Sequence, residues 1–183
     1  MEKKLNNRKV AIVVTDGFEQ SEFEKPLEAL KKEGAEVDVV SPKKGKIKAW
    51  NEKNWGNEFE ANVAISEASS DKYDALLLPG GVMNPDNLRA DKKVVAFVKD
   101  FLQNDKPVAS ICHGPWTLIE TGLLKGRKLT SYHTIKTDLQ NAGAQWVDEE
   151  VVVDNGLVTS RNPKDLPAFC DKMVEEFAEG VHH

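Results

Sequence analysis

The chain has 183 residues, of which 40% are hydrophobic and 30% charged, and its formal net charge at pH 7 is −5. This length supports a single domain over residues 1–183, with its core between residues 9 and 179. The negative charge argues against a general nucleic-acid-binding role, and no apolar run reaches the roughly 20 residues of a membrane span. The polar start lacks the apolar segment of a secretory signal, so we expect a cytoplasmic protein.

Residues able to bind a metal are scarce. The sequence has two cysteines, which form no Cys-x-x-Cys pair, and four histidines, of which His182 and His183 resemble the remnant of a purification tag. This set is too small for a structural zinc site, and we predict no metal. The basic run from Lys43 to Lys48 is typical of a solvated hairpin turn rather than of a phosphate or nucleic-acid site.

Apolar runs of strand length alternate with helical patterns along the chain, which predicts a mostly parallel sheet with helices on both faces. The turn signal Asp154-Asn155-Gly156 adds a small antiparallel hairpin. In chain order we predict a strand at 9–15, a helix at 21–33, strands at 36–41 and 47–50, a loop at 51–62, a brief strand at 63–65, a helical turn at 66–72, a strand at 74–79, a helix capped by Asp91, a strand ending at Cys112, a helix at 116–121, a strand at 129–132, a helix at 135–141, a hairpin at 151–159 and a final helix at 164–179.

Cys112 is the most informative residue, because a buried strand stops at it and a helix follows. This strand-to-helix turn would direct backbone N–H groups and the positive end of a helix dipole at the sulfur. We therefore expect Cys112 to be a nucleophile with a lowered pKa. The other cysteine, Cys170, lies in a helical apolar pattern and is expected to pack in the core, without a disulfide to Cys112.

Two other segments follow central strands and should meet Cys112 at the same edge of the sheet. One contains Glu19 and Glu22, and the other is the turn Gly80-Gly81. A charged carboxylate beside the thiol would oppose its ionisation, so the useful arrangement is a buried, protonated Glu22 that donates a hydrogen bond to sulfur. The backbone N–H groups of Gly81 and His113 are expected to stabilise an oxyanion.

Five motifs in fixed order make the chain similar to the PfpI-type intracellular protease family, in the superfamily of the Parkinson-disease-associated protein deglycase. The motifs are DGFEQSEFEKP, DALLLPGG, VASICHGP, GRKLTS and EVVVDNGLVTSRNPKDLPAF, and they cover nearly the whole chain. The resemblance implies a flavodoxin-like three-layer α/β sandwich and cofactor-independent chemistry. It also implies catalytic roles for Cys112, for the following His113 and for Glu22.

The resemblance also implies a homodimer or larger homo-oligomer, in which an acid from a neighbouring subunit completes a triad. Asp86 occupies that position, where glutamate is expected. Trp116 replaces the usual glutamine after Cys-His-Gly-Pro and is expected to line or narrow the substrate pocket, together with Glu19 and Tyr132. Tyr132 stands where the deglycase branch places a histidine, and the next residue, His133, is expected to lie at the surface.

We therefore expect a cysteine-dependent stress-response enzyme acting on small reactive aldehydes or early glycation adducts, of the deglycase or glutathione-independent glyoxalase type. The alternative is a cysteine peptidase that uses the same Cys112 and His113 site and cleaves peptides. A second alternative, from a different class, is a redox-sensing or chaperone-like stress protein in which Cys112 is oxidised.

Overall fold

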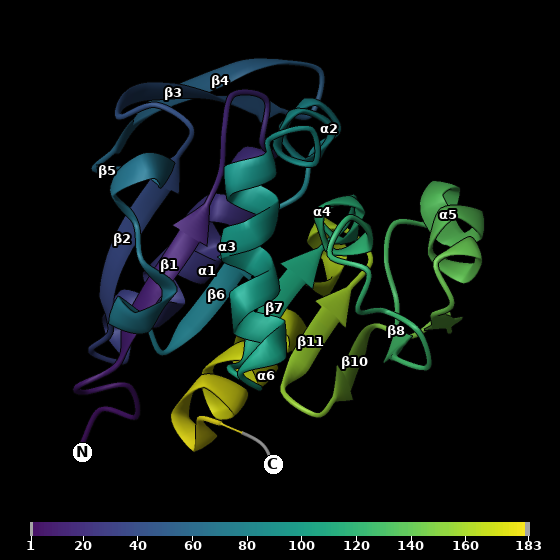
Figure 1. Ribbon diagram of the computed structural model, residues 1–183. Coiled ribbons are helices and arrows are strands. Elements are labelled where there is room, and N and C mark those ends of the chain that lie inside the picture. The colour runs from purple at the N-terminus through teal and green to yellow at the C-terminus, as the bar shows by residue number, and fades with distance from the viewer. Residues whose placement is uncertain (1, 182–183) are drawn as a thin grey trace.

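A computed structural model describes residues 2–181, so His182 and His183 lie outside the described residues. Seven strands form one sheet in the order β10-β11-β7-β6-β1-β2-β5, and two strand pairs lie outside it (Figure 1). The strands are β1 (Lys9–Val13), β2 (Glu36–Ser41), β3 (Gly45–Asn51), β4 (Asn54–Ala61), β5 (Val63–Ala64), β6 (Ala75–Leu78), β7 (Val108–Ile111), β8 (Lys128–Leu129), β9 (Gln145–Trp146), β10 (Val151–Asp154) and β11 (Leu157–Ser160). The α-helices are α1 (Gln20–Lys32), α2 (Met83–Leu88), α3 (Lys92–Gln103), α4 (Pro115–Ile119), α5 (Lys136–Asn141) and α6 (Leu166–Glu179), and 3-10 turns lie at Ile65–Glu67, Ser70–Lys72, His133–Ile135 and Pro163–Asp165.

The central sheet is parallel except at one edge. β1 pairs in parallel with β2 and β6, β6 pairs with β7, and β7 pairs with β11. Only the edge strand β10 is antiparallel to its neighbour within the described sheet, across the predicted hairpin turn. The predicted mostly parallel sheet with an antiparallel hairpin is therefore confirmed. Asp91 also caps α3 as predicted, because its side chain accepts hydrogen bonds from the N–H groups of Lys93 and Val94.

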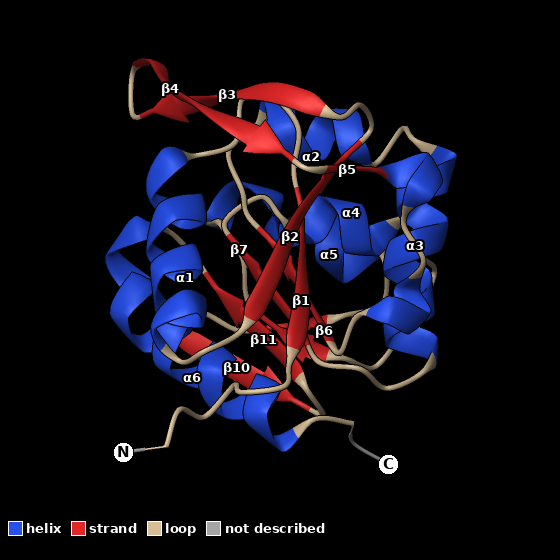
Figure 2. Cartoon of the chain, turned by 90° about the vertical axis from the view of Figure 1, so that its left-hand side faces the viewer, coloured by secondary structure: helices blue, strands red, loops and turns tan. Residues whose placement is uncertain are grey.

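Helices cover both faces of the sheet, because successive strand residues point to opposite sides. In β1, Val10 and Ile12 pack with one apolar cluster that includes side chains of α1 and α6, whereas Ala11 and Val13 pack with a second cluster that includes α3. Figure 2 shows α1 and α6 on one side of the sheet and α3 on the other. This three-layer arrangement leaves the carboxyl ends of the strands free to form a site.

The predicted loop at 51–62 is wrong, because most of it is the strand β4. β4 pairs antiparallel with β3, and this hairpin lies across the carboxyl ends of the central strands (Figures 1 and 2). Most residues of β4 are exposed and half of them are polar, so the strand lacks the apolar run that identifies the central strands. Phe59 nevertheless anchors it against Phe18 and Phe23, with ring centroids 5.8 and 4.9 Å away.

Two other elements differ from the prediction. The strand expected at 129–132 is only the two-residue β8, which pairs with β9 outside the main sheet. The short helix α2 was not predicted. Its six residues contain Pro85, and no side chain caps its N-terminus, so neither periodicity nor a capping residue indicates it.

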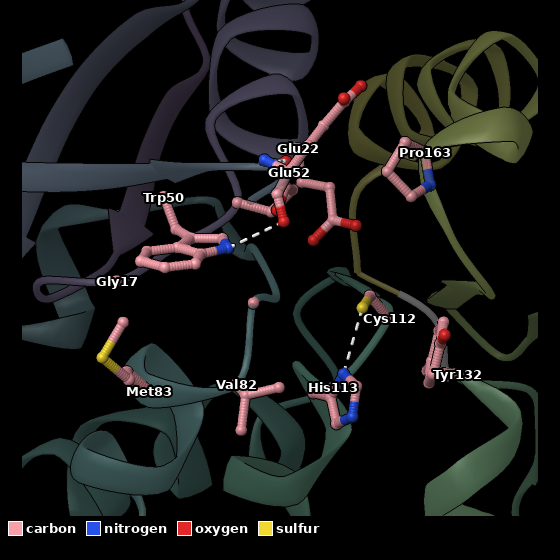
Figure 3. Close-up of a pocket in the computed structure, with 12 residues that line it drawn as sticks. Gly17, Glu22, Trp50, Glu52, Val82, Met83, Cys112, His113, Tyr132 and Pro163 are labelled. Atoms are coloured by element: carbon pink, nitrogen blue, oxygen red, sulfur yellow. Dashed lines mark hydrogen bonds between the residues drawn. The ribbon is translucent and has the colours of Figure 1, made fainter. Parts of the chain in front are cut away.

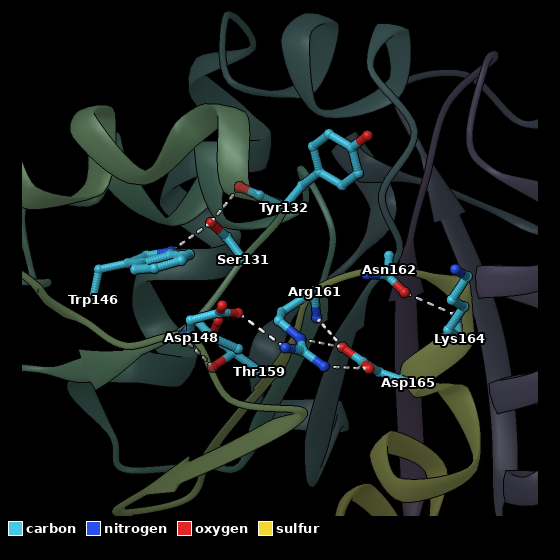
Figure 4. Close-up of polar contacts among 10 residues, drawn as sticks. Ser131, Tyr132, Trp146, Asp148, Thr159, Arg161, Asn162, Lys164 and Asp165 are labelled. Carbon is cyan, nitrogen blue, oxygen red and sulfur yellow. Dashed lines mark hydrogen bonds and ion pairs between the residues drawn. The ribbon is translucent and has the colours of Figure 1, made fainter.

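Arg161 joins the end of β11 to the start of α6 (Figure 4). Its Nε and Nη2 donate to the buried carboxylate of Asp165 at 2.9 and 3.0 Å, and its Nη1 donates to Asp148 at 2.9 Å. Removing Arg161 would leave the Asp165 charge buried without its partner. We expect Arg161→Ala to lower the free energy of unfolding by about 2 kcal/mol, measured by urea denaturation.

The matched control is Asp148→Asn, because the Asp148 side chain is 69% exposed. An exposed ion pair contributes less than about 1 kcal/mol, so this variant should unfold close to the wild-type midpoint. Equal midpoints for Arg161→Ala and Asp148→Asn would contradict a stabilising role for the Arg161–Asp165 pair.

Candidate active site

A cavity of about 430 Å³ lies at the carboxyl ends of β1, β6 and β7 (Figure 3). Its walls come from segments far apart in the sequence: the loop before α1, the β3–β4 turn, the turn after β6, and the turn after β7. The lining residues are Gly17, Glu19, Glu22, Trp50, Glu52, Gly81, Val82, Met83, Cys112, His113, Tyr132 and Pro163.

Cys112 occupies a strained turn directly after β7. Its φ is +63°, a left-handed conformation that side-chain-bearing residues rarely adopt. Gly114 makes this turn possible, because a Cβ there would collide with Ser110 and lie 2.7 Å from the carbonyl oxygen of Leu78. The cysteine is 7% exposed, and it reaches solvent through the cavity that it lines. The turn therefore presents the thiol to a ligand while fixing its direction.

His113 lies beside the thiol and is held on both sides of its ring. Its Nδ1 is 3.2 Å from Sγ of Cys112, and its Nε2 is 3.3 Å from Oγ1 of Thr134. The ring stacks on Tyr132, with centroids 4.8 Å apart. Burial lowers the pKa of His113, and the charge of His133 lowers it further. A neutral imidazole with Nδ1 unprotonated can accept the proton of the Cys112 thiol.

Glu22 is fully buried in the first turn of α1. Its Oε1 accepts a hydrogen bond of 3.0 Å from the backbone N–H of Gly80, and its Oε2 has no hydrogen-bond partner. Burial raises the pKa of Glu22 to about 8, with a smaller contribution from the charge of Glu19. At neutral pH Glu22 therefore holds a proton, as the sequence predicted, and this acid lines the cavity.

The predicted lowering of the Cys112 pKa is wrong. Burial raises this pKa well above its ordinary value, and charge on Glu22 raises it further, whereas the backbone N–H groups of Gly81 and His113 lower it. The sequence showed the N–H groups but not the depth of burial. The thiol therefore needs a base at the moment of attack, and Nδ1 of His113 is positioned to act as one.

Gly80 and Gly81 allow the three segments of the site to approach each other. A Cβ on Gly80 would lie 2.5 Å from Oε1 of Glu22 and 2.7 Å from Cβ of Cys112, so only glycine leaves room for both side chains here. Gly81 has a φ of +79°, and a Cβ there would collide with the carbonyl oxygen of Gly17 and lie 2.8 Å from the Glu19 nitrogen.

We expect Gly81→Ala to lower the free energy of unfolding by about 2–3 kcal/mol, because backbone atoms cannot move aside as a flexible side chain can. Gly122→Ala is the control. Gly122 has a similar φ of +73°, but a Cβ there meets nothing within 4 Å. It should therefore lose only about 1–2 kcal/mol from backbone strain. Equal losses in urea denaturation would show that the contacts of Gly81 have no energetic role.

The structure brings most of the predicted site residues together. Glu19 and Tyr132 line the cavity with Cys112, His113 and Glu22. His133 is exposed and does not line the cavity, as expected for a surface histidine, and its ring is tilted against that of Tyr132 with centroids 4.6 Å apart.

One predicted pocket residue lies elsewhere. Trp116 does not line the cavity and needs correction: it packs edge-on against the His113 ring at 5.2 Å and donates from Nε1 to Asp138 at 2.9 Å. Asp86 is exposed on α2, outside the cavity lining. Within the described chain, Nε2 of His113 contacts Oγ1 of Thr134. The role of Asp86 from a neighbouring subunit stays a prediction.

Sequence reasoning missed the β3–β4 wall of the cavity, formed by Trp50 and Glu52. The backbone N–H of Glu52 donates to Oε1 of Glu19 at 3.2 Å, and the indole Nε1 of Trp50 donates to the carbonyl oxygen of Glu52 at 3.0 Å. These residues lie about 30 positions from Glu22 in the sequence. The only local signal is the polar turn that follows the short strand predicted at 47–50.

Among the described residues, the acidic group with spacing suited to a metal is Glu175, Glu176 and Glu179 on α6, and none of these lines the cavity. No described helix has the length and apolar character needed to cross a membrane.

Residues 8–176 match the DJ-1/PfpI family, so the chain belongs to this family, as its motifs indicated. The Drosophila melanogaster protein DJ-1beta has a similar structure, with a TM-score of 0.85 and 27% sequence identity over 93% of this chain and 90% of that one. This likeness and the observed layers confirm the predicted flavodoxin-like sandwich.

Relatives with similar sequences carry different functional names. Deglycase TK1284 of Thermococcus kodakarensis is 47% identical over 91% of this chain and 98% of that protein. Protein/nucleic acid deglycase 2 of Escherichia coli is 46% identical over 89% and 94%. A Bacillus subtilis protein named "Putative cysteine protease YraA" is 45% identical over 89% and 94%.

Proposed function

We propose that this protein is a cysteine-dependent, cofactor-independent enzyme that converts 2-oxoaldehydes such as methylglyoxal, and their early adducts, into hydroxy acids. The main support is that the thiol of Cys112, the neutral imidazole of His113 and the protonated carboxylic acid of Glu22 line one cavity of about 430 Å³. The deglycase names of two relatives support the same chemistry. Both cysteines are free thiols, which fits a reducing compartment, so we place the activity in the cytoplasm.

The first step joins sulfur to the aldehyde carbon of methylglyoxal. As the S–C bond forms, the thiol proton moves to Nδ1 of His113, and Glu22 gives its proton to the aldehyde oxygen. The product is a hemithioacetal. The backbone N–H groups of Gly81 and His113, which already interact with Sγ, would stabilise negative charge on that oxygen in the transition state.

Two pairs of proton transfers then convert the hemithioacetal into a thioester. The Glu22 carboxylate removes the hydrogen of the former aldehyde carbon while His113 protonates the neighbouring ketone oxygen, which gives an enediol. Glu22 returns the proton to the former ketone carbon, and the hydroxyl on the sulfur-bearing carbon gives its proton to His113, which forms the thioester carbonyl. Water then attacks the thioester, the C–S bond breaks, and lactic acid, the free thiol, neutral His113 and protonated Glu22 are formed. Methylglyoxal plus water thus equals lactic acid, with no external oxidant or reductant.

The test is incubation of the purified protein with methylglyoxal in the absence of glutathione, followed by proton NMR. We expect lactate to form at the rate at which methylglyoxal disappears, and mass spectrometry of quenched samples to find a lactyl thioester on Cys112. Loss of methylglyoxal without lactate would overturn the proposal. Selective oxidation of Cys112 by mild peroxide without any turnover would instead support the redox-sensor alternative.

Peptide hydrolysis, the alternative function, depends on a second copy of the chain. Val82 and Met83 are 54% and 38% exposed beside the cavity, and Asp86 is exposed on the same short helix. Exposed apolar residues at such a place favour a homodimer or larger homo-oligomer, which we also propose. Asp86 of another copy would then complete a triad with His113. Light scattering tests the assembly, and a fluorogenic peptide, with Asp86→Ala as the variant, tests the peptidase activity.

A further inference from the structure

The charge of the cavity is unusually one-sided. Three glutamates line it, and no lysine or arginine is among its lining residues. Glu22 is the deepest of the three and holds a proton at neutral pH. Glu19 and Glu52 lie at the entrance, and Glu52 is exposed to solvent. A substrate therefore passes two carboxylates on its way to Cys112.

Glu52 is held in place at this entrance by its backbone. Its φ is +56°, a conformation that favours glycine or asparagine, so a glutamate here costs conformational energy. Two hydrogen bonds maintain this conformation: the backbone N–H of Glu52 donates to the Glu19 carboxylate, and the indole N–H of Trp50 donates to the carbonyl oxygen of Glu52. Figure 3 shows Trp50 and Glu52 on the wall opposite His113 and Tyr132. An aromatic face next to carboxylates attracts cations in two independent ways.

The inner end of the cavity contains an unpaired acid oxygen. Oε2 of Glu22 is buried, has no hydrogen-bond partner and belongs to a residue that lines the cavity. Burying a carboxylic acid oxygen without a hydrogen-bond partner costs free energy, and a ligand that pairs with this oxygen would recover that cost. The acid can donate its proton to a basic atom of the substrate, such as a nitrogen that leaves during the reaction.

We propose that Glu52, together with Glu19 and Trp50, makes the enzyme selective for aldehyde adducts of cationic groups, above all the guanidinium of arginine, over neutral thiol adducts and free methylglyoxal. This inference rests on the proposed function. In the adduct, sulfur bonds to the carbinol carbon, the C–N bond breaks, and Glu22 protonates the departing nitrogen while His113 takes the thiol proton. The released guanidine regains its native form, and the same hemithioacetal continues to lactate.

The test compares three substrates: methylglyoxal alone, its preformed adduct with N-acetyl-arginine amide, and its preformed adduct with N-acetyl-cysteine amide. Lactate formation is followed by NMR, with free methylglyoxal measured in each mixture. We expect the wild type to have the highest kcat/KM for the arginine adduct. In Glu52→Gln, the ratio of kcat/KM for the arginine adduct to that for methylglyoxal should fall about three- to fivefold, and added salt should lower the wild-type ratio as well.

Glu58→Gln is the matched control, because Glu58 lies on the same hairpin, pairs with Lys46 at 3.7 Å and does not line the cavity. Its ratio should equal that of the wild type. The inference is overturned if lactate forms only in proportion to free methylglyoxal, or if Glu52→Gln keeps the wild-type ratio; the proposed function stands in both cases. Absence of lactate from all three substrates would overturn the proposed function itself.

Discussion

Cys112→Ser is expected to reduce methylglyoxal turnover by at least about a thousandfold. Cys112 is the sole thiol among the lining residues, and no serine, threonine or lysine in that lining could replace it as a nucleophile. A serine hydroxyl has a far higher pKa than a thiol, and at this depth of burial His113 would not deprotonate it efficiently. Lactate formation at saturating methylglyoxal measures the effect.

Cys170→Ser is the control, because it makes the same chemical change outside the site. Cys170 is half-buried on α6, packs beside the apolar core and does not line the catalytic cavity. We expect wild-type turnover from this variant. Both substitutions replace sulfur by oxygen without changing the side chain's shape, so thermal unfolding should remain close to that of the wild type. If Cys112→Ser retained more than about a tenth of the activity, covalent catalysis by this residue would be excluded.

The central strands and the catalytic turn could be predicted because each is determined by local sequence. β1, β6 and β7 are short, mainly apolar strands, and each is followed within three residues by an acid, a glycine or a cysteine at the same edge of the sheet. Parallel pairing then brings their carboxyl ends together. The sequence therefore predicts that Glu22, Gly81 and Cys112 lie close to each other, and all three line one cavity in the structure.

The entrance of the cavity and the ionisation of the thiol could not be predicted in the same way. Glu52 reaches the site only because a half-exposed hairpin, with mixed polar residues, folds across the sheet. Trp116 was expected in the pocket because it follows the catalytic motif, yet its indole turns away to Asp138. The pKa of Cys112 depends on burial and on Glu22, which lies 90 positions earlier in the chain. Such properties arise from packing between distant segments.

Glu22→Gln is expected to change both stability and activity, and the change in stability should depend on pH. The pKa of Glu22 is about 8 in the folded protein and 4.5 in its ordinary state. Since the pKa of Glu22 is raised in the folded protein, binding of its proton stabilises the folded state. This contribution is complete below pH 4.5 and is lost as pH rises through about 8. Between these values the folded state binds one more proton than the unfolded state. The free energy of unfolding therefore falls with rising pH, by about 1.4 kcal/mol per unit from this group alone.

Glutamine cannot titrate, so the variant lacks this slope. The difference in free energy of unfolding, wild type minus Glu22→Gln, should fall by up to about 4 kcal/mol between pH 5 and pH 8, measured by urea denaturation at each pH. Glu28→Gln, an exposed position on the same helix, should follow the wild-type curve. Parallel curves for wild type and Glu22→Gln would show that Glu22 ionises normally. Because glutamine cannot give a proton to the aldehyde oxygen, turnover at pH 7 should also fall by about a hundredfold or more, which ties the buried proton to catalysis.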